Sequence, residues 1–337
     1  MRSAFITGLA GQQLTASEAS LLRAARPCGI ILFQRNIADP EQVCRLSDAA
    51  RAAVGGQDFL VLIDQEGGRV QRLRPPHWPD RPAAALYGAA HARDPAGAVR
   101  AARFAAALTA AELVALGINT SCAPVLDLPG PGGHDVIGDR AYGASPERVI
   151  ALGRAVADGL LAGGVLPVIK HIPGHGRATK DSHLELPTVA ATRQDLERSD
   201  FLPFQALAEL PAAMTAHVVF AAIDPAAPAS ISRRVIGDVI RGHIGFDGLL
   251  MSDDLGMAAL SGSMPERAKA ALDAGSDLAL LCGGNFAEME AVAAVVPALE
   301  GRSLQRFERA CAAIELPQAL DVAEAEACLV EVLRLSA

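Results

Sequence analysis

The stretch VLPVIKH, residues 165–171, indicates the fold more directly than any other segment. It is apolar along most of its length and ends in two polar side chains, Lys170 and His171. A short run that is apolar on both faces is typical of a parallel strand, because a parallel sheet is covered on both sides. Polar residues at the carboxyl end of such a strand indicate a site at that edge of the sheet.

Seven further apolar runs recur along the chain, at residues 4–8, 29–33, 59–64, 118–127, 212–217, 248–254 and 277–282. Segments with helical apolar spacing separate them, such as residues 95–117, which close with a glycine. Another helix is predicted from the capping box TASE at residues 15–18. Eight strands alternating with helices predict an α/β fold, a single-domain (β/α)8 TIM-type barrel over residues 1–337. The last helices, from about residue 285, are expected to pack on the barrel.

Composition excludes several classes of protein. The 337 residues are 51% apolar, and the net charge of −8 comes without a basic block, so nucleic acid and anionic membranes are not expected partners. The amino-terminal segment lacks a secretory apolar region and no stretch is long enough to span a membrane, which predicts a cytoplasmic protein. The six scattered cysteines show no zinc-ribbon spacing and are expected to be buried reduced thiols.

The ends of the predicted strands share an unusual feature, which is that they carry polar side chains. These are Asp64, Asp127, Lys170, His171, His217, Asp253 and Asp254. In a barrel all of these positions face one mouth, where barrel enzymes build their active sites. The set therefore predicts an enzyme, although each residue alone could merely cap a strand or the helix that follows it.

The loop KHIPGHGRATKDSHLE, residues 170–185, is the most concentrated source of ionisable groups. Its glycines and proline exclude a helix, and it lacks the spacing of a phosphate-binding loop. A metal site of His171, His175 and His183 is one reading of it. In the other reading, Asp181 orients His183 as a proton donor and Asp253 supplies a carboxylate nucleophile across the mouth.

Four motifs resemble those of the bacterial β-N-acetylglucosaminidases of glycoside hydrolase family 3. They are LIDQEGGRVQRL, IGDRAYG, KHIPGHGRATKDSH and LLMSDDLGM, and the likeness extends from GIILFQRN at residue 29 to past residue 257. The resemblance implies that Asp253 is the nucleophile, that His183 is the acid/base and that Asp181 is its dyad partner. It also implies that the sugar is held by Asp64, Arg72, Arg140, Lys170 and His171. For Arg72 and Arg140, a structural ion pair with a neighbour such as Glu66 or Asp139 is the alternative.

The resemblance further implies a retaining hydrolase without metal or cofactor, which needs no second domain because a histidine replaces the usual glutamate acid/base. The implied substrate is a small carbohydrate, a β-linked N-acetylglucosamine on a cell-wall fragment that ends in 1,6-anhydro-N-acetylmuramic acid, with or without peptide, in peptidoglycan recycling. A monomer is expected. Three alternatives stay open: a phosphorylase with the same site, a metal-dependent hydrolase and a non-catalytic sugar-binding barrel. The role of Asp254 is open as well, since a second carboxylate could instead polarise a substrate acetamido group.

Overall fold

Eight parallel strands close into a barrel in the computed structural model, which describes residues 1–336 except 57, 131–133, 181 and 183–185. Each predicted apolar run supplies one strand, which confirms the predicted barrel. In order around the barrel the strands are β1 (Ser3–Gly8), β12 (Leu278–Leu281), β11 (Leu249–Asp254), β9 (Ala212–Thr215), β7 (Leu166–Ile172), β6 (Thr120–Ser121), β3 (Leu60–Ile63) and β2 (Pro27–Leu32).

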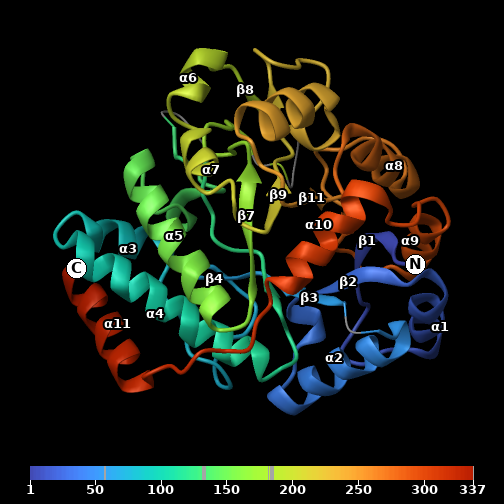
Figure 1. Ribbon diagram of the computed structural model, residues 1–337, viewed down its shortest axis with the longest axis horizontal. Coiled ribbons are helices and arrows are strands. Elements are labelled where there is room, and N and C mark those ends of the chain that lie inside the picture. Colours follow the sequence, from blue (N-terminus) through green and yellow to red (C-terminus); the bar gives the residue numbers. More distant parts are fainter. Residues whose placement is uncertain (57, 131–133, 181, 183–185, 337) are drawn as a thin grey trace.

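Helices surround this barrel (Figure 1). The α-helices are α1 (Ala16–Ala25), α2 (Pro40–Val54), α3 (Ala84–His91), α4 (Pro95–Val114), α5 (Pro146–Ala162), α6 (Arg193–Glu197), α7 (Leu202–Ala206), α8 (Met264–Ala274), α9 (Phe286–Ala293), α10 (Gly301–Ala312) and α11 (Val322–Ser336). Short 3-10 or π segments are η1 (Gln34–Asn36), η2 (Gly138–Arg140), η3 (Ala229–Ile231) and η4 (Val235–His243). Two small sheets pair β4 (Gln65–Gly67) with β5 (Val70–Gln71) and β8 (Thr188–Val189) with β10 (Val219–Phe220).

The helices begin where local chemistry favours it. The predicted capping box is present, because Thr15 Oγ1 accepts the N–H of Glu18 at 3.1 Å and Glu18 Oε2 accepts that of Thr15 at 2.9 Å. Helix α2 starts with Asp39 as cap and proline at its first position, a combination that satisfies one free N–H and removes another. Helix α4 ends at Val114, and a turn then leads to Gly117 in a left-handed conformation (φ +71°).

The run at residues 118–127 differs from its prediction, because only Thr120–Ser121 is regular strand. Pro124 lacks the N–H that a central strand needs to donate. The chain nevertheless stays beside β7, with the N–H of Lys170 donating to Pro124 O at 3.2 Å and the N–H of Leu126 donating to Lys170 O at 2.8 Å. Asp127, at the end of this irregular segment, still lies at the mouth of the barrel, where it contacts His171.

The interior of the barrel is filled by alternating side chains of the strands, including Ile6, Ile31, Leu62, Val168, Met214 and Leu280. The carboxyl-terminal helices pack on the barrel and its outer helices, with α11 lying along α3 and α4 (Figure 1). Three cysteines are buried and the other three only half-buried, all as free thiols, so the expectation of burial was wrong for Cys44, Cys311 and Cys328. In the described part of the chain, no helix has both the length and the apolar character to cross a membrane.

Candidate active site

A pocket of about 320 Å³ opens at the carboxyl ends of the barrel strands. Six of the eight candidate residues line it: Asp64, Arg72, Arg140, Lys170, His171 and Asp253. They come from segments that are far apart in the sequence, so the barrel closure brings them together. The other two candidates, Asp181 and His183, lie outside the described residues. Ser182, which stands between them in the sequence, is buried and also lines the pocket.

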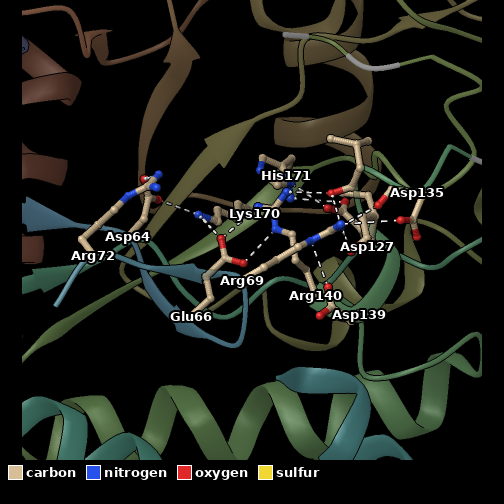
Figure 2. Close-up of polar contacts among 12 residues, drawn as sticks. Asp64, Glu66, Arg69, Arg72, Asp127, Asp135, Asp139, Arg140, Lys170 and His171 are labelled. Carbon is tan, nitrogen blue, oxygen red and sulfur yellow. Dashed lines mark hydrogen bonds and ion pairs between the residues drawn. The ribbon is translucent and has the colours of Figure 1, made fainter. Parts of the chain in front are cut away.

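Five charged side chains form a row of alternating sign along this pocket (Figure 2). In order they are Arg72, Asp64, Lys170, Glu66 and Arg140. Lys170 Nζ lies at the centre, 2.9 Å from Asp64 Oδ1 and 2.6 Å from Glu66 Oε1. Arg72 Nη2 donates to Asp64 Oδ2 at 3.0 Å, and Arg140 holds both oxygens of Glu66 at 2.8 and 2.9 Å. Three cations against two carboxylates leave one positive charge in excess.

Burial makes these charges interact strongly, since Lys170 and Glu66 expose only 3% and 7% of their side chains. Burial alone would lower the pKa of Lys170, but the carboxylates of Asp64 and Glu66 raise it above its ordinary value. Burial would also raise the pKa of Asp64, yet Lys170 and Arg72 hold it well below the usual range. Lys170 and Asp64 therefore stay charged at neutral pH and present a fixed donor and a fixed acceptor.

Asp253 lies at the end of β11, where its Oδ1 accepts the backbone N–H of Asp254 at 2.8 Å. Burial by itself would raise the pKa of Asp253. The charges of His217, His171 and Lys170 and the Asp254 N–H outweigh that effect and hold the pKa below its ordinary value. The carboxylate is therefore ionised at neutral pH, as a nucleophile must be.

The three cations of the row differ in the carboxylates on which they act. Lys170 contributes directly to the lowered pKa of Asp253. Arg72 and Arg140 are paired with the carboxylates of the row instead, and the bond to Glu66 is the ion pair that the sequence left as an alternative for Arg140. Arg72 still has an uncommitted donor, because its buried Nε has no hydrogen-bond partner among the described residues.

A buried carboxylate fixes the orientation of His171. Asp127 Oδ2 lies 2.6 Å from His171 Nδ1, and its Oδ1 accepts the backbone N–H of His175 at 2.7 Å. Since a carboxylate only accepts, His171 carries a proton on Nδ1, and its side chain lines the pocket. Burial and the neighbouring His171 lower the pKa of His175 to about 4, so that ring is neutral at pH 7. Its Nε2 lies 3.0 Å from Ser182 Oγ.

Asp254 points into the scaffold. Its Oδ1 accepts the backbone N–H groups of Gly256 and Cys282, both at 2.9 Å, and it caps no helix, since α8 begins ten residues further on. His217 is a buried core residue whose Nε2–H donates to Asp254 O at 2.9 Å, while its Nδ1 contacts Ser230 Oγ at 2.6 Å. This pair of bonds fixes the backbone on which Asp253 stands.

Two members of the site were given no specific role in it from the sequence. Glu66 was considered only as an ion-pair partner, although it stands two residues after Asp64, so that an extended chain directs both carboxylates to the same side. Asp127 was counted among the polar strand ends, with a cap as its alternative, and its bond to His171 was not predicted. Within the described residues, no group of three or more histidine, cysteine or acidic side chains is arranged to hold a metal ion.

Comparison with known proteins places this site in a family. Residues 6–314 match the model of the glycosyl hydrolase family 3 N terminal domain. The β-hexosaminidase of Alkalilimnicola ehrlichii is 46% identical over 293 residues, which cover 86% of this chain and 82% of that protein. That of Stenotrophomonas maltophilia is 41% identical over 303 residues, covering 89% and 88%. The structure of NagZ from Neisseria gonorrhoeae in complex with N-trifluoroacetyl-D-glucosamine aligns with a TM-score of 0.86 at 32% identity, covering 100% of this chain and 98% of that one. The chain therefore belongs to glycoside hydrolase family 3 and is a glycoside hydrolase.

Proposed function

We propose that this protein is a retaining exo-β-N-acetylglucosaminidase that releases terminal N-acetylglucosamine from β-linked cell-wall fragments, including those that end in 1,6-anhydro-N-acetylmuramic acid, with or without peptide. The observation that carries the proposal is an ionised Asp253 in the same pocket as a row of charged hydrogen-bonding groups. The β-hexosaminidases among its relatives, and the glucosamine derivative bound by the Neisseria structure, support the choice of sugar.

In this proposal the Asp253 carboxylate attacks the anomeric carbon while His183, as imidazolium, gives its proton to the departing oxygen. A glycosyl ester on Asp253 results. Neutral His183 then takes a proton from water as the water attacks the same carbon, which frees Asp253 and regenerates the imidazolium. Two displacements give net retention. Asp181 orients His183, and the pocket position of Ser182 between them supports an acid/base at this point of the chain.

The sugar would be held by Asp64, Arg72, Arg140, Lys170 and His171. Asp64 keeps lone pairs for hydroxyl protons beyond its bonds to Lys170 and Arg72, and the guanidinium and ammonium groups donate to hydroxyl oxygens. No metal or cofactor takes part in this scheme. We further propose that one barrel domain performs the whole reaction in a cytoplasmic monomer that serves peptidoglycan recycling.

The test is NMR of the first product formed from an aryl N-acetyl-β-glucosaminide, with a chelator present and with or without phosphate. We expect free β-anomer in both conditions. An α-anomer as first product contradicts retention, and a sugar 1-phosphate identifies a phosphorylase. Loss of turnover in chelator points to a metal-dependent enzyme. Binding without any turnover, measured by calorimetry with N-acetylglucosamine, points to a sugar-binding protein.

A further inference from the structure

Arg69 lies in the turn between β4 and β5 and holds the segment that closes one side of the pocket. Its Nη2 lies 2.5, 2.9 and 3.1 Å from the carbonyl oxygens of three successive residues, Asp135, Val136 and Ile137. Its Nε lies 2.9 Å from Asp139 Oδ1 (Figure 2). Val136 and Ile137 line the pocket, so this one guanidinium binds the backbone of a segment that forms part of the pocket wall.

Residues 135–137 form a turn that leads into η2, with Ile137 in the right-handed helical region and Gly138 left-handed (φ +42°). The carbonyl oxygens of this turn carry partial negative charge and lie together around Arg69 Nη2, which favours a cation. The positive φ favours glycine at this position, and a Cβ at Gly138 would lie 2.4 Å from Asp135 Oδ1 and 3.0 Å from Arg69 Nη2, so both side chains would have to move. The guanidinium thus caps the turn.

A second ion pair joins the β4–β5 hairpin to η2, with the charges reversed. In one pair the hairpin supplies the carboxylate, Glu66, to Arg140; in the other it supplies the cation, Arg69, to Asp139. The first pair is buried, but Arg69 and Asp139 expose 41% and 46% of their side chains. An exposed ion pair alone contributes little, and the hydrogen bonds to three successive carbonyls add to it and tie Arg69 to the backbone of the turn.

We propose that Arg69 is a positioning residue for the sugar site, which acts by capping residues 135–137 and so setting the place of Arg140. The inference rests on the proposed function, in which Arg140 binds the sugar. Arg140 Nη1 also donates to Val136 O at 3.3 Å, so both guanidinium groups share that oxygen and a shift of the turn reaches Arg140 directly. A lysine could not replace Arg69, since one ammonium lacks the fork that spans carbonyls and carboxylate.

The first experiment measures kcat and KM of Arg69→Ala and Arg69→Lys with an aryl N-acetyl-β-glucosaminide. Loss of a charge-assisted contact predicts a KM raised about tenfold in both variants, with kcat changed less than about threefold. Free guanidinium at a non-denaturing concentration is expected to lower the KM of Arg69→Ala toward the wild-type value, because it can fill the carbonyl cap. Sodium chloride at equal ionic strength is not expected to lower this KM. An unchanged KM in Arg69→Ala, or equal effects of the two salts, overturns the inference.

Arg154→Ala is the matched control, since Arg154 is also half-exposed, donates to the carbonyl of Ala206 and pairs with Glu209, but lies outside the pocket. Its KM is expected to be that of the wild type. The double exchange Arg69→Asp with Asp139→Arg restores an ion pair but sets a carboxylate against the carbonyls. We therefore expect its KM to remain raised, and a wild-type KM would overturn the role given to the carbonyls.

Arg140→Lys separates this inference from the proposed function. If Arg140→Lys raises KM and Arg69→Ala does not, the sugar site stands and the inference about Arg69 falls. If neither variant raises KM, both the proposed sugar-binding role of Arg140 and the inference about Arg69 are wrong. A merely structural role of Arg69 would lower the melting temperature of Arg69→Ala and leave KM unchanged.

Discussion

The two ends of the barrel both contain buried networks of charge, and they are built differently. At the amino-terminal end of the strands, Asp277 accepts four hydrogen bonds within 3.0 Å. The donors are Arg241, Ser303, Arg306 and the backbone N–H of Leu250. A carboxylate has about four lone-pair positions, so this one is saturated by the protein itself.

At the carboxyl-terminal end, the row from Arg72 to Arg140 lines an open pocket and is not saturated. Arg72 Nε has no partner among the described residues, and three cations face two carboxylates. The comparison indicates how one barrel separates two tasks. A closed network holds strands together, whereas a network in which one donor has no partner among the described residues, and which has one positive charge in excess, is suited to a polar ligand.

The largest expected effect is at Asp253, because it would form a covalent bond. Asp253→Asn keeps the size of the side chain but removes the nucleophile, which should lower kcat at least about a thousandfold. Stopped-assay kinetics with an aryl N-acetyl-β-glucosaminide measure it. The control is Asp247→Asn at the opposite end, where an exposed carboxylate pairs with Arg306 and Arg309 and kcat should not change. A kcat within tenfold of wild type for Asp253→Asn would show that another group attacks the sugar.

At Asp277, whose side chain is 1% exposed, we expect an effect on stability and none on catalysis. Asp277→Asn removes the counter-charge of Arg241 and leaves Arg306 with only the exposed Asp247, which should lower the free energy of unfolding by about 2–4 kcal/mol. KM and kcat should stay at their wild-type values. Urea unfolding measures the first and steady-state kinetics the second, again with Asp247→Asn as the exposed counterpart. A normal stability, or a lowered kcat in the folded variant, would contradict the separation of tasks.

The smallest expected effect concerns pH. Because the pKa of Asp253 is lowered in the folded protein, the carboxylate stays ionised below the ordinary carboxyl range. Lys170→Met removes one contribution, so the pKa of Asp253 rises and the acid limb of kcat/KM moves to higher pH. The shift should be less than about one unit, since the histidines contribute more. A limb that stays in place or moves to lower pH would show that Lys170 does not act on Asp253.

Most of the barrel could be predicted because each strand is buried on both faces and therefore reads as an apolar run. The exception at residues 118–127 shows the limit of this pattern. Burial continues along that run, but Pro124 lacks a donor, so apolar character alone overestimates the regular strand. Six site residues were placed in one pocket for a related reason, since a parallel barrel brings the carboxyl ends of all strands to one mouth.

The partnerships within the site could not be predicted, because they join segments that only the closed barrel brings together. The bond of Asp127 to His171 spans 44 residues, and that of Lys170 to Asp64 spans 106. Arg69 lies inside a recognisable motif, yet nothing in its neighbourhood along the chain indicates three carbonyl oxygens some 66 residues away. The sequence patterns reveal which residues are polar at strand ends, and the pairing requires the fold.

Closure of the barrel also has a consequence for synthesis of the protein. Strand β1 pairs with both β2 and β12, so the first strand keeps an open edge until residues 278–281 have been made. At a ribosomal rate of roughly 5–20 residues per second, that interval is on the order of 15–55 seconds. During it the nascent chain exposes apolar strand edges that can pair with other chains. The open edge of β1 is therefore covered only after β12 has been synthesised and has paired with it, which ends this period of exposure to aggregation.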